Sequence, residues 1–124
     1  MTYTILIIDD DETLREMLRE VLTRSGHHVL SAENGELGIK LIQIHSVDLV
    51  ITDIYMPHTD GLEVTIKLRE THPEIKIIVI TGNAPEFYVD SAMMLGAHDS
   101  LKKPFQLLEL ESKINSLLSV DTPK

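Results

Sequence analysis

The chain has 124 residues, the size of a single domain, and 43% of them are hydrophobic, enough to form a buried core. It has no cysteine, which excludes disulfides and thiolate metal sites; it also shows no membrane span or signal peptide, so we expect a cytoplasmic protein. The formal net charge of −9 argues against direct nucleic-acid binding. Because the apolar runs are short, we also expect no membrane association.

Short β-branched runs alternate with amphipathic helical patterns along the chain. Their continuous apolar character is typical of strands buried on both faces of a sheet. The predicted strands are 4–8, 28–32, 48–52, 75–80 and 99–102.

Helical spacing of apolar residues fills the segments between these strands. The first helix ends at Gly26 and the second begins at Asn34, a plausible N-cap. The third covers about 61–71, and the fourth begins near Pro85 as its first residue. The fifth covers about 105–118. The stripes expected to face the core are Leu14, Met17, Leu18, Val21 and Leu22 in the first helix, Leu37, Leu41 and Ile44 in the second, and Leu107, Leu110, Ile114 and Leu117 in the fifth. Five strand–helix units predict an α/β fold, a parallel sheet with helices on both faces.

Chemically competent side chains follow four of the five predicted strands. Asp9 and Asp10 follow the first strand, Asp53 the third, Thr81 the fourth and Lys103 the fifth. Because ligands of open α/β sheets bind beyond the carboxyl ends of the strands, we expect these residues at one edge of the sheet.

This set of residue types predicts phosphoryl transfer. Converging carboxylates repel one another, and a divalent cation relieves the repulsion; oxygen ligands favour Mg²⁺, with Mn²⁺ possible. A carboxylate beside such a metal can attack phosphorus to form an acyl phosphate. A lysine and a hydroxyl would balance the charge of the transferred group.

The motifs ILIIDDDE, DLVITDIYMPHTDGLE, IIVITG, LGA and LKKPF resemble the receiver domain of two-component response regulators. The resemblance covers residues 4 to about 118 and implies a flavodoxin-like (βα)5 fold with strand order 2-1-3-4-5. We therefore assign residues 1–120 to a receiver domain and 121–124 to a polar tail. The resemblance also implies a bacterial phosphorelay protein. Such a protein catalyses only its own phosphorylation and dephosphorylation and is not otherwise an enzyme.

The resemblance assigns a role to each site residue. Asp53 is the phosphoacceptor, and Lys103 contacts the phosphoryl group. Asp10 binds Mg²⁺ directly, Asp9 acts largely through water, and the backbone carbonyl of Tyr55 completes the metal ligands. Asn83 and Tyr55 occupy positions that tune dephosphorylation, and Pro57 and Gly61 match the turn after the third strand.

Thr81 and Ser100 are the expected switch residues. By resemblance, the hydroxyl of Thr81 swings toward the phosphoryl group and shifts the face formed by the fourth helix, fifth strand and fifth helix. Ser100 stands where the family usually has Tyr or Phe, and a serine cannot move a large ring, so we expect altered coupling.

The resemblance also implies the partners. The phosphoryl group would come from a sensor histidine kinase or a histidine phosphotransfer protein, and the output would be binding to a downstream protein target. We expect a monomer or a weak phosphorylation-dependent dimer. The chain is either a stand-alone receiver or the receiver part of a longer regulator.

Several residues have simpler interpretations. Asp11 and Glu12 are expected to cap a helix or to be solvated, Lys102 to be solvated, and Met93 and Met94 to pack in the core. One of Phe87 and Tyr88 could be exposed and contact a partner, and core packing is at least as good an interpretation of both. The scattered histidines do not predict a metal site. They are His27, His28, His45, His58, His72 and His98.

Three other functions stay open. The pattern DDDET also fits a haloacid-dehalogenase-like phosphatase with Asp9 as nucleophile and Asp11 as acid/base, but it leaves Asp53 unexplained. A flavin carrier would need a neutral, Gly- and Ser-rich loop after the first strand, where this chain is acidic. A pseudo-receiver would bind partners without phosphorylation.

Overall fold

The computed structural model describes residues 2–54, 60–82 and 85–119. Strands and helices alternate from end to end in this part of the chain. The elements are β1 (Thr4–Ile8), α1 (Glu12–Arg24), β2 (His28–Ala32), α2 (Gly35–Ile44), β3 (Leu49–Asp53), α3 (Gly61–Thr71), β4 (Lys76–Thr81), α4 (Glu86–Leu95), β5 (Asp99–Lys102) and α5 (Leu107–Ser119).

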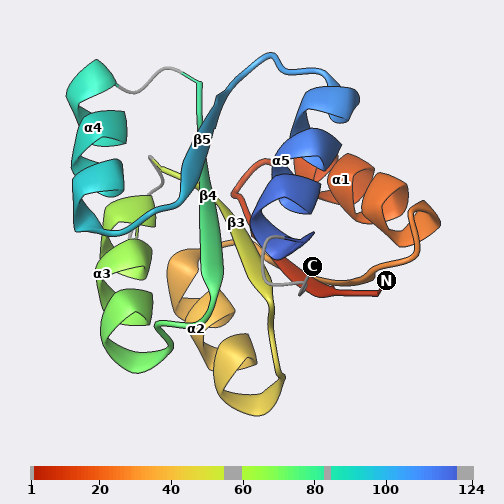
Figure 1. The fold of residues 1–124 in the computed structure, drawn as a ribbon, viewed down its shortest axis with the longest axis horizontal. Coiled ribbons are helices and arrows are strands. Elements are labelled where there is room, and N and C mark those ends of the chain that lie inside the picture. The colour runs from red at the N-terminus through yellow and green to blue at the C-terminus, as the bar shows by residue number, and fades with distance from the viewer. Residues whose placement is uncertain (1, 55–59, 83–84, 120–124) are drawn as a thin grey trace.

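The five strands form one parallel sheet in the order β2-β1-β3-β4-β5 (Figure 1). The expected flavodoxin-like fold is therefore confirmed. Two strands lie one residue later than predicted, so that Asp53 and Thr81 are the last residues of β3 and β4. Asp53 and Thr81 thus belong to the sheet itself, because their backbones are still in register with neighbouring strands.

Helices cover both faces of the sheet (Figure 1), and alternate strand residues feed two separate cores. Leu6 and Ile8 of β1 pack on the side of α2, α3 and α4, whereas Ile5 and Ile7 pack on the side of α1 and α5. This double burial explains the continuous apolar runs of the strands. No helix in the described part of the chain is long and apolar enough to cross a membrane.

Helix N-caps fix where the chain leaves the sheet. The Asp11 side chain accepts a hydrogen bond from the Leu14 backbone N–H, which confirms its expected capping role. Asn34 caps α2 through the N–H of Leu37, as predicted. Asp60 caps α3 by accepting from two backbone N–H groups. Each cap places a helix start just beyond a strand end.

The predicted stripe of α2 was wrong at two of its three residues, whereas Leu41 packs against the core as expected. Leu37 is 39% and Ile44 is 75% exposed, whereas Gly38 and Ile42 face the core. A Cβ atom at Gly38 would lie 2.8 Å from Cγ1 of Ile8, so the helix lies almost directly on β1. Because α2 and β1 lie so close together, the position requires a residue without a side chain. A prediction based on large apolar residues therefore misses the face of α2 that contains Gly38.

Helix α4 also differs from expectation. Met93 is 40% and Met94 is 89% exposed, so the prediction that both pack in the core was wrong. Pro85 is the N-cap of α4 and not its first residue. Phe87 is 61% exposed and stacks on Tyr88, which packs against the core. This helix therefore exposes more apolar surface than its sequence period suggested.

His98 closes the edge of the sheet where β5 begins. Its backbone N–H donates to the carbonyl of Ile77, and its ring Nδ1 accepts from the Ile77 N–H at 3.0 Å. Partial burial lowers the pKa of His98, and the positive charges of Lys76 and Arg69 add to the effect. The neutral ring thus takes the place of a strand carbonyl, because a protonated Nδ1 could not accept this bond.

We expect His98 to make folding stability fall in acid. Its pKa is lower in the folded protein than the ordinary value of 6.5, so the unfolded chain binds the proton more readily and the stabilisation is lost as pH falls below about 6.5. In His98→Asn the amide oxygen can accept the same bond without titrating, so the loss of unfolding free energy between pH 7 and pH 5 should be smaller. Denaturant unfolding at the two pH values checks this, with exposed His45→Asn as the control. Parallel pH curves for wild type and His98→Asn would contradict it.

Candidate functional site

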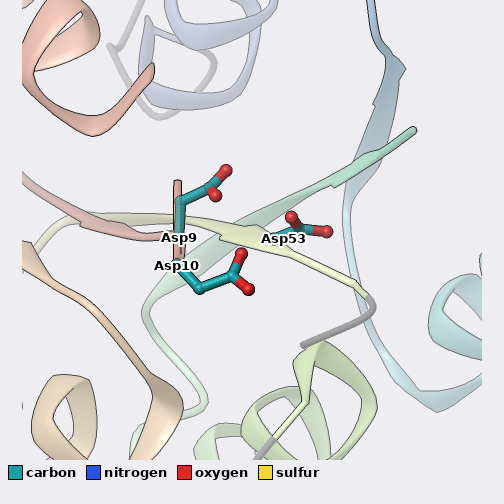
Figure 2. Close-up of side chains that lie close together, drawn as sticks. All are labelled: Asp9, Asp10 and Asp53. Atoms are coloured by element: carbon teal, nitrogen blue, oxygen red, sulfur yellow. The ribbon is translucent and has the colours of Figure 1, made fainter. Parts of the chain in front are cut away.

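Three carboxylates meet at the carboxyl edge of the sheet. Asp9 and Asp10 follow β1, and Asp53 ends β3, the neighbouring strand. One oxygen from each lies within 4.8 Å of the others, and Figure 2 shows the three side chains around a common space. Asp9 and Asp53 are buried, whereas Asp10 is exposed. The structure thus brings together the three predicted acids.

Lys103 supplies the positive charge of the site. Its Nζ lies 3.1 Å from Oδ2 of Asp53, to which it donates a hydrogen bond, and 3.3 Å from Oδ2 of Asp9. Burial alone would lower the pKa of Lys103, but the two carboxylates outweigh it and raise the pKa. The lysine therefore stays charged between the two acids. By contrast, Lys102 is exposed, as expected.

Asp9 is held at all of its polar groups. Its backbone N–H donates to Ala32, and its carbonyl accepts from Nη1 of Arg15 at 2.8 Å. Its Oδ1 accepts from the N–H of Asp11 at 2.9 Å, and its Oδ2 faces Lys103. Burial raises the pKa of Asp9, as does the nearby Asp53, against the opposing effects of the Asp11 hydrogen bond and of Lys103. The carboxylate is therefore fixed in place but incompletely neutralised.

Two buried oxygens of the site have no hydrogen-bond partner among the described residues. They are Oδ2 of Asp9, which has only its ion pair with Lys103, and Oγ1 of Thr81. Buried polar atoms normally have such partners, so their absence points to a group that the protein binds. The cluster offers only oxygen ligands, which fits Mg²⁺ or Mn²⁺ and not zinc.

Gly61 fixes the chain next to Asp53. Its N–H donates to the carbonyl of Ile54, and a Cβ atom at this position would lie 2.6 Å from the carbonyl oxygen of Asp53 and 2.7 Å from Cα of Ile54. Because these are backbone atoms, they cannot move aside for a side chain. The start of α3 is therefore packed directly against the end of β3, at the phosphoacceptor candidate.

Some sequence predictions fall elsewhere. The Tyr55 carbonyl, Pro57, Asn83 and the tail 121–124 lie outside the described residues. Ser100 is half-buried in β5, in register with Val79, and its N–H donates to Oδ1 of Asp99. Thr81 pairs with Lys102, and its carbonyl accepts the N–H of Lys103. Thr81 and Lys103 thus belong to adjacent strand ends.

Sequence reasoning missed two supporting groups. One is the guanidinium of Arg15, and the other is the backbone N–H of Asp11, which both bind Asp9. A backbone donor leaves no signal in the sequence. Arg15 lies in the first turns of α1 and could be taken for any surface arginine.

Comparison with known proteins agrees with this geometry. A family model described as a response regulator receiver domain matches residues 5–115. The chain is 38% identical over 123 residues to the response regulator MprA of Mycolicibacterium vanbaalenii, covering 99% of this chain and 53% of that protein. It is 33% identical over 118 residues to the transcriptional regulatory protein PhoP of Bacillus subtilis, covering 95% and 49%. The chain thus spans about half the length of these curated relatives.

Solved structures show the same fold. A CheY-like receiver domain protein from Methanospirillum hungatei superposes with a TM-score of 0.91 at 28% identity, covering 96% of this chain and 95% of that one. The response regulator TrrA of Thermotoga maritima, solved in complex with Mg²⁺ and BeF, gives a TM-score of 0.82 at 37% identity, covering 93% and 98%.

We expect Lys103→Met to destabilise the protein at neutral pH. Without the ammonium, the buried Asp9 carboxylate faces Asp53 unopposed and its pKa rises further, so the cost should be about 2 kcal/mol at pH 7, given the partial exposure of Lys103. Because Asp9 then binds a proton more readily when folded, the deficit should shrink toward pH 5. Urea unfolding without divalent metal measures this, with Lys102→Met as the control. Equal stability of the two variants at pH 7 would count against the ion-pair account.

Proposed function

The chain belongs to the response regulator receiver family, and we propose that it accepts a phosphoryl group on Asp53. The observation that carries the proposal is the convergence of Asp53 with Asp9, Asp10 and Lys103 at one sheet edge. Asp53 is the last residue of β3, its backbone is in register with β4, and its Oδ2 accepts a hydrogen bond from the Lys103 ammonium. The nearby ammonium would also stabilise the negative charge of a phosphoryl group attached to Asp53.

The chemistry follows from the side chains. A carboxylate oxygen of Asp53 would form a bond to phosphorus while the bond from phosphorus to a histidine nitrogen of the donor breaks. The other ring nitrogen of the phosphohistidine carries a proton, so the products are an acyl phosphate and a neutral imidazole. Lys103 would shift its contact from Asp53 to the new phosphoryl oxygens. The unpartnered hydroxyl of Thr81 would donate a hydrogen bond to the same group. Hydrolysis of the acyl phosphate would reset the site.

We also propose that Asp9, Asp10 and Asp53 hold Mg²⁺, or Mn²⁺ in its place, together with the Tyr55 carbonyl. The all-oxygen donors and the lack of a hydrogen bond to Oδ2 of Asp9 support this, as does the complex of TrrA with Mg²⁺ and BeF. The bound cation would neutralise charge on the transferred phosphoryl group. The exposed Asp10 is accessible as a direct ligand, whereas Asp9 is shared with Lys103.

Signal output would be a change in protein binding through α4, β5 and α5, with Thr81 and Ser100 as the switch residues. Exposed apolar side chains on α4 and α5 support this face as a contact surface: Phe87, Met93, Met94, Leu95 and Leu108. The partners would be a sensor histidine kinase or histidine phosphotransfer protein, and a downstream protein target. We propose a cytoplasmic protein that is a monomer or a weak phosphorylation-dependent dimer, with residues 1–120 as the receiver.

Intact mass after incubation with acetyl phosphate and Mg²⁺ tests the acceptor. Wild type should gain one base-labile phosphoryl group, and Asp53→Asn should lose nearly all of it because the amide is not a nucleophile. Asp9→Asn is the matched control, since it should keep partial labelling. Donor hydrolysis that survives in Asp53→Asn and vanishes in Asp9→Asn would instead support the phosphatase alternative. Mg²⁺ binding without any adduct would support a pseudo-receiver for this donor.

Thermal melting tests the metal ligands. Mg²⁺ should raise the melting temperature of wild type, because a ligand that binds only the folded state stabilises it. The rise should be much smaller in Asp10→Ala, which removes the exposed carboxylate, and unchanged in Asp90→Ala, which removes an exposed carboxylate on α4. The same rise in wild type and Asp10→Ala would remove Asp10 from the site.

A further inference from the structure

Arg15, next to the acidic site, pairs with no carboxylate among the described residues. Arg15 is half-buried on α1 and lies close in sequence to Asp9, Asp10, Asp11 and Glu12. Its Nη1 instead donates to the backbone carbonyl of Asp9 at 2.8 Å, and its side chain forms no ion pair within the described residues. Arg19 and Arg24 on the same helix pair with Glu16 and Glu20. Arg15 is therefore used differently from its neighbours.

The bonded carbonyl belongs to the peptide unit that joins Asp9 to Asp10. The N–H of Asp9 donates a hydrogen bond to the carbonyl of Ala32, and its side chain accepts one from Asp11 and forms an ion pair with Lys103. These contacts fix the backbone N–H and the side chain of Asp9, and the bond from Arg15 fixes its carbonyl. Asp10 is exposed, and no side-chain hydrogen bond or ion pair restrains it within the described residues. The orientation of the Asp9–Asp10 peptide plane sets the direction of the Asp10 Cα–Cβ bond, from which the carboxylate extends toward the common space with Asp53 (Figure 2).

We propose that Arg15 is a positioning residue for the cation site, acting through the Asp9 carbonyl to hold Asp10 toward Asp53. The inference rests on the proposed function and extends it to a residue that touches neither the metal nor the phosphoryl group. Groups that orient metal ligands from outside typically affect affinity roughly 10-fold or more. Arg15 would act through a backbone carbonyl, since it forms no hydrogen bond or ion pair with a ligand side chain among the described residues.

The positive charge of Arg15, considered alone, predicts the opposite change in Mg²⁺ affinity. Removing a positive charge beside three carboxylates should strengthen binding of a divalent cation, whereas losing the positioning bond should weaken it. The sign of the change in Mg²⁺ affinity therefore separates the two explanations. Arg15→Met keeps the aliphatic stem and removes both charge and donor, and Arg15→Lys restores a charged donor of similar reach.

The experiment is calorimetric titration of the full chain with MgCl₂, together with melting temperatures measured without metal. Arg15→Met should bind Mg²⁺ about 10-fold more weakly than wild type. Arg15→Lys should recover most of the affinity, and Arg19→Met should match wild type. The metal-free melting temperatures of the Arg15 and Arg19 variants should be similar, which separates positioning from a purely structural role.

Two outcomes overturn the inference. One is Mg²⁺ affinity in Arg15→Met that equals or exceeds that of wild type, and the other is weakening matched by Arg19→Met. If wild type itself neither binds Mg²⁺ nor takes up a phosphoryl group, the proposed function fails, and that result is distinct from both. A lower melting temperature of Arg15→Met with unchanged affinity would make Arg15 a structural residue only.

Discussion

Repulsion between carboxylates is the constraint on which the rest of the site depends. Two unit charges within 4.8 Å repel by roughly 3 to 4 kcal/mol at an effective dielectric constant of about 20. The fold accepts this cost because both buried acids are attached to paired strands and share the Lys103 ammonium. One lysine cannot balance three acids. The remaining negative charge is what the proposed Mg²⁺ would neutralise.

Much of this arrangement could be predicted because it depends on strand ends. Apolar runs identify the strands, parallel strands end at one edge, and the residues after the runs must then converge. That reasoning placed Asp9, Asp10, Asp53 and Lys103 correctly, and the Asp11 and Asn34 caps followed from residue type alone. The strand order came from family resemblance, since chain pattern does not distinguish one order of neighbours from another.

What could not be predicted involves groups with no side-chain signature. The α2 stripe was misplaced because its contact with β1 is made by Gly38, which has no apolar side chain to count. The exposed Met93 and Met94 have the apolar character of core residues, and only the three-dimensional structure shows which way they face. The bond from Arg15 to a backbone carbonyl likewise follows from the path of the chain, not from the partner's residue type.

Gly38 and Gly61 have different consequences for the evolution of this chain. The obstacle at Gly38 is the side chain of Ile8, so a shorter residue at position 8 removes the closest atoms and can compensate for an added methyl group. The obstacle at Gly61 is the backbone of Asp53 and Ile54, which no substitution elsewhere can shorten. A larger residue at position 38 can therefore be accommodated by a second substitution at position 8, whereas no second substitution can accommodate a larger residue at position 61. The contact between β3 and α3 should persist while the contact between β1 and α2 diverges among descendants of this sequence.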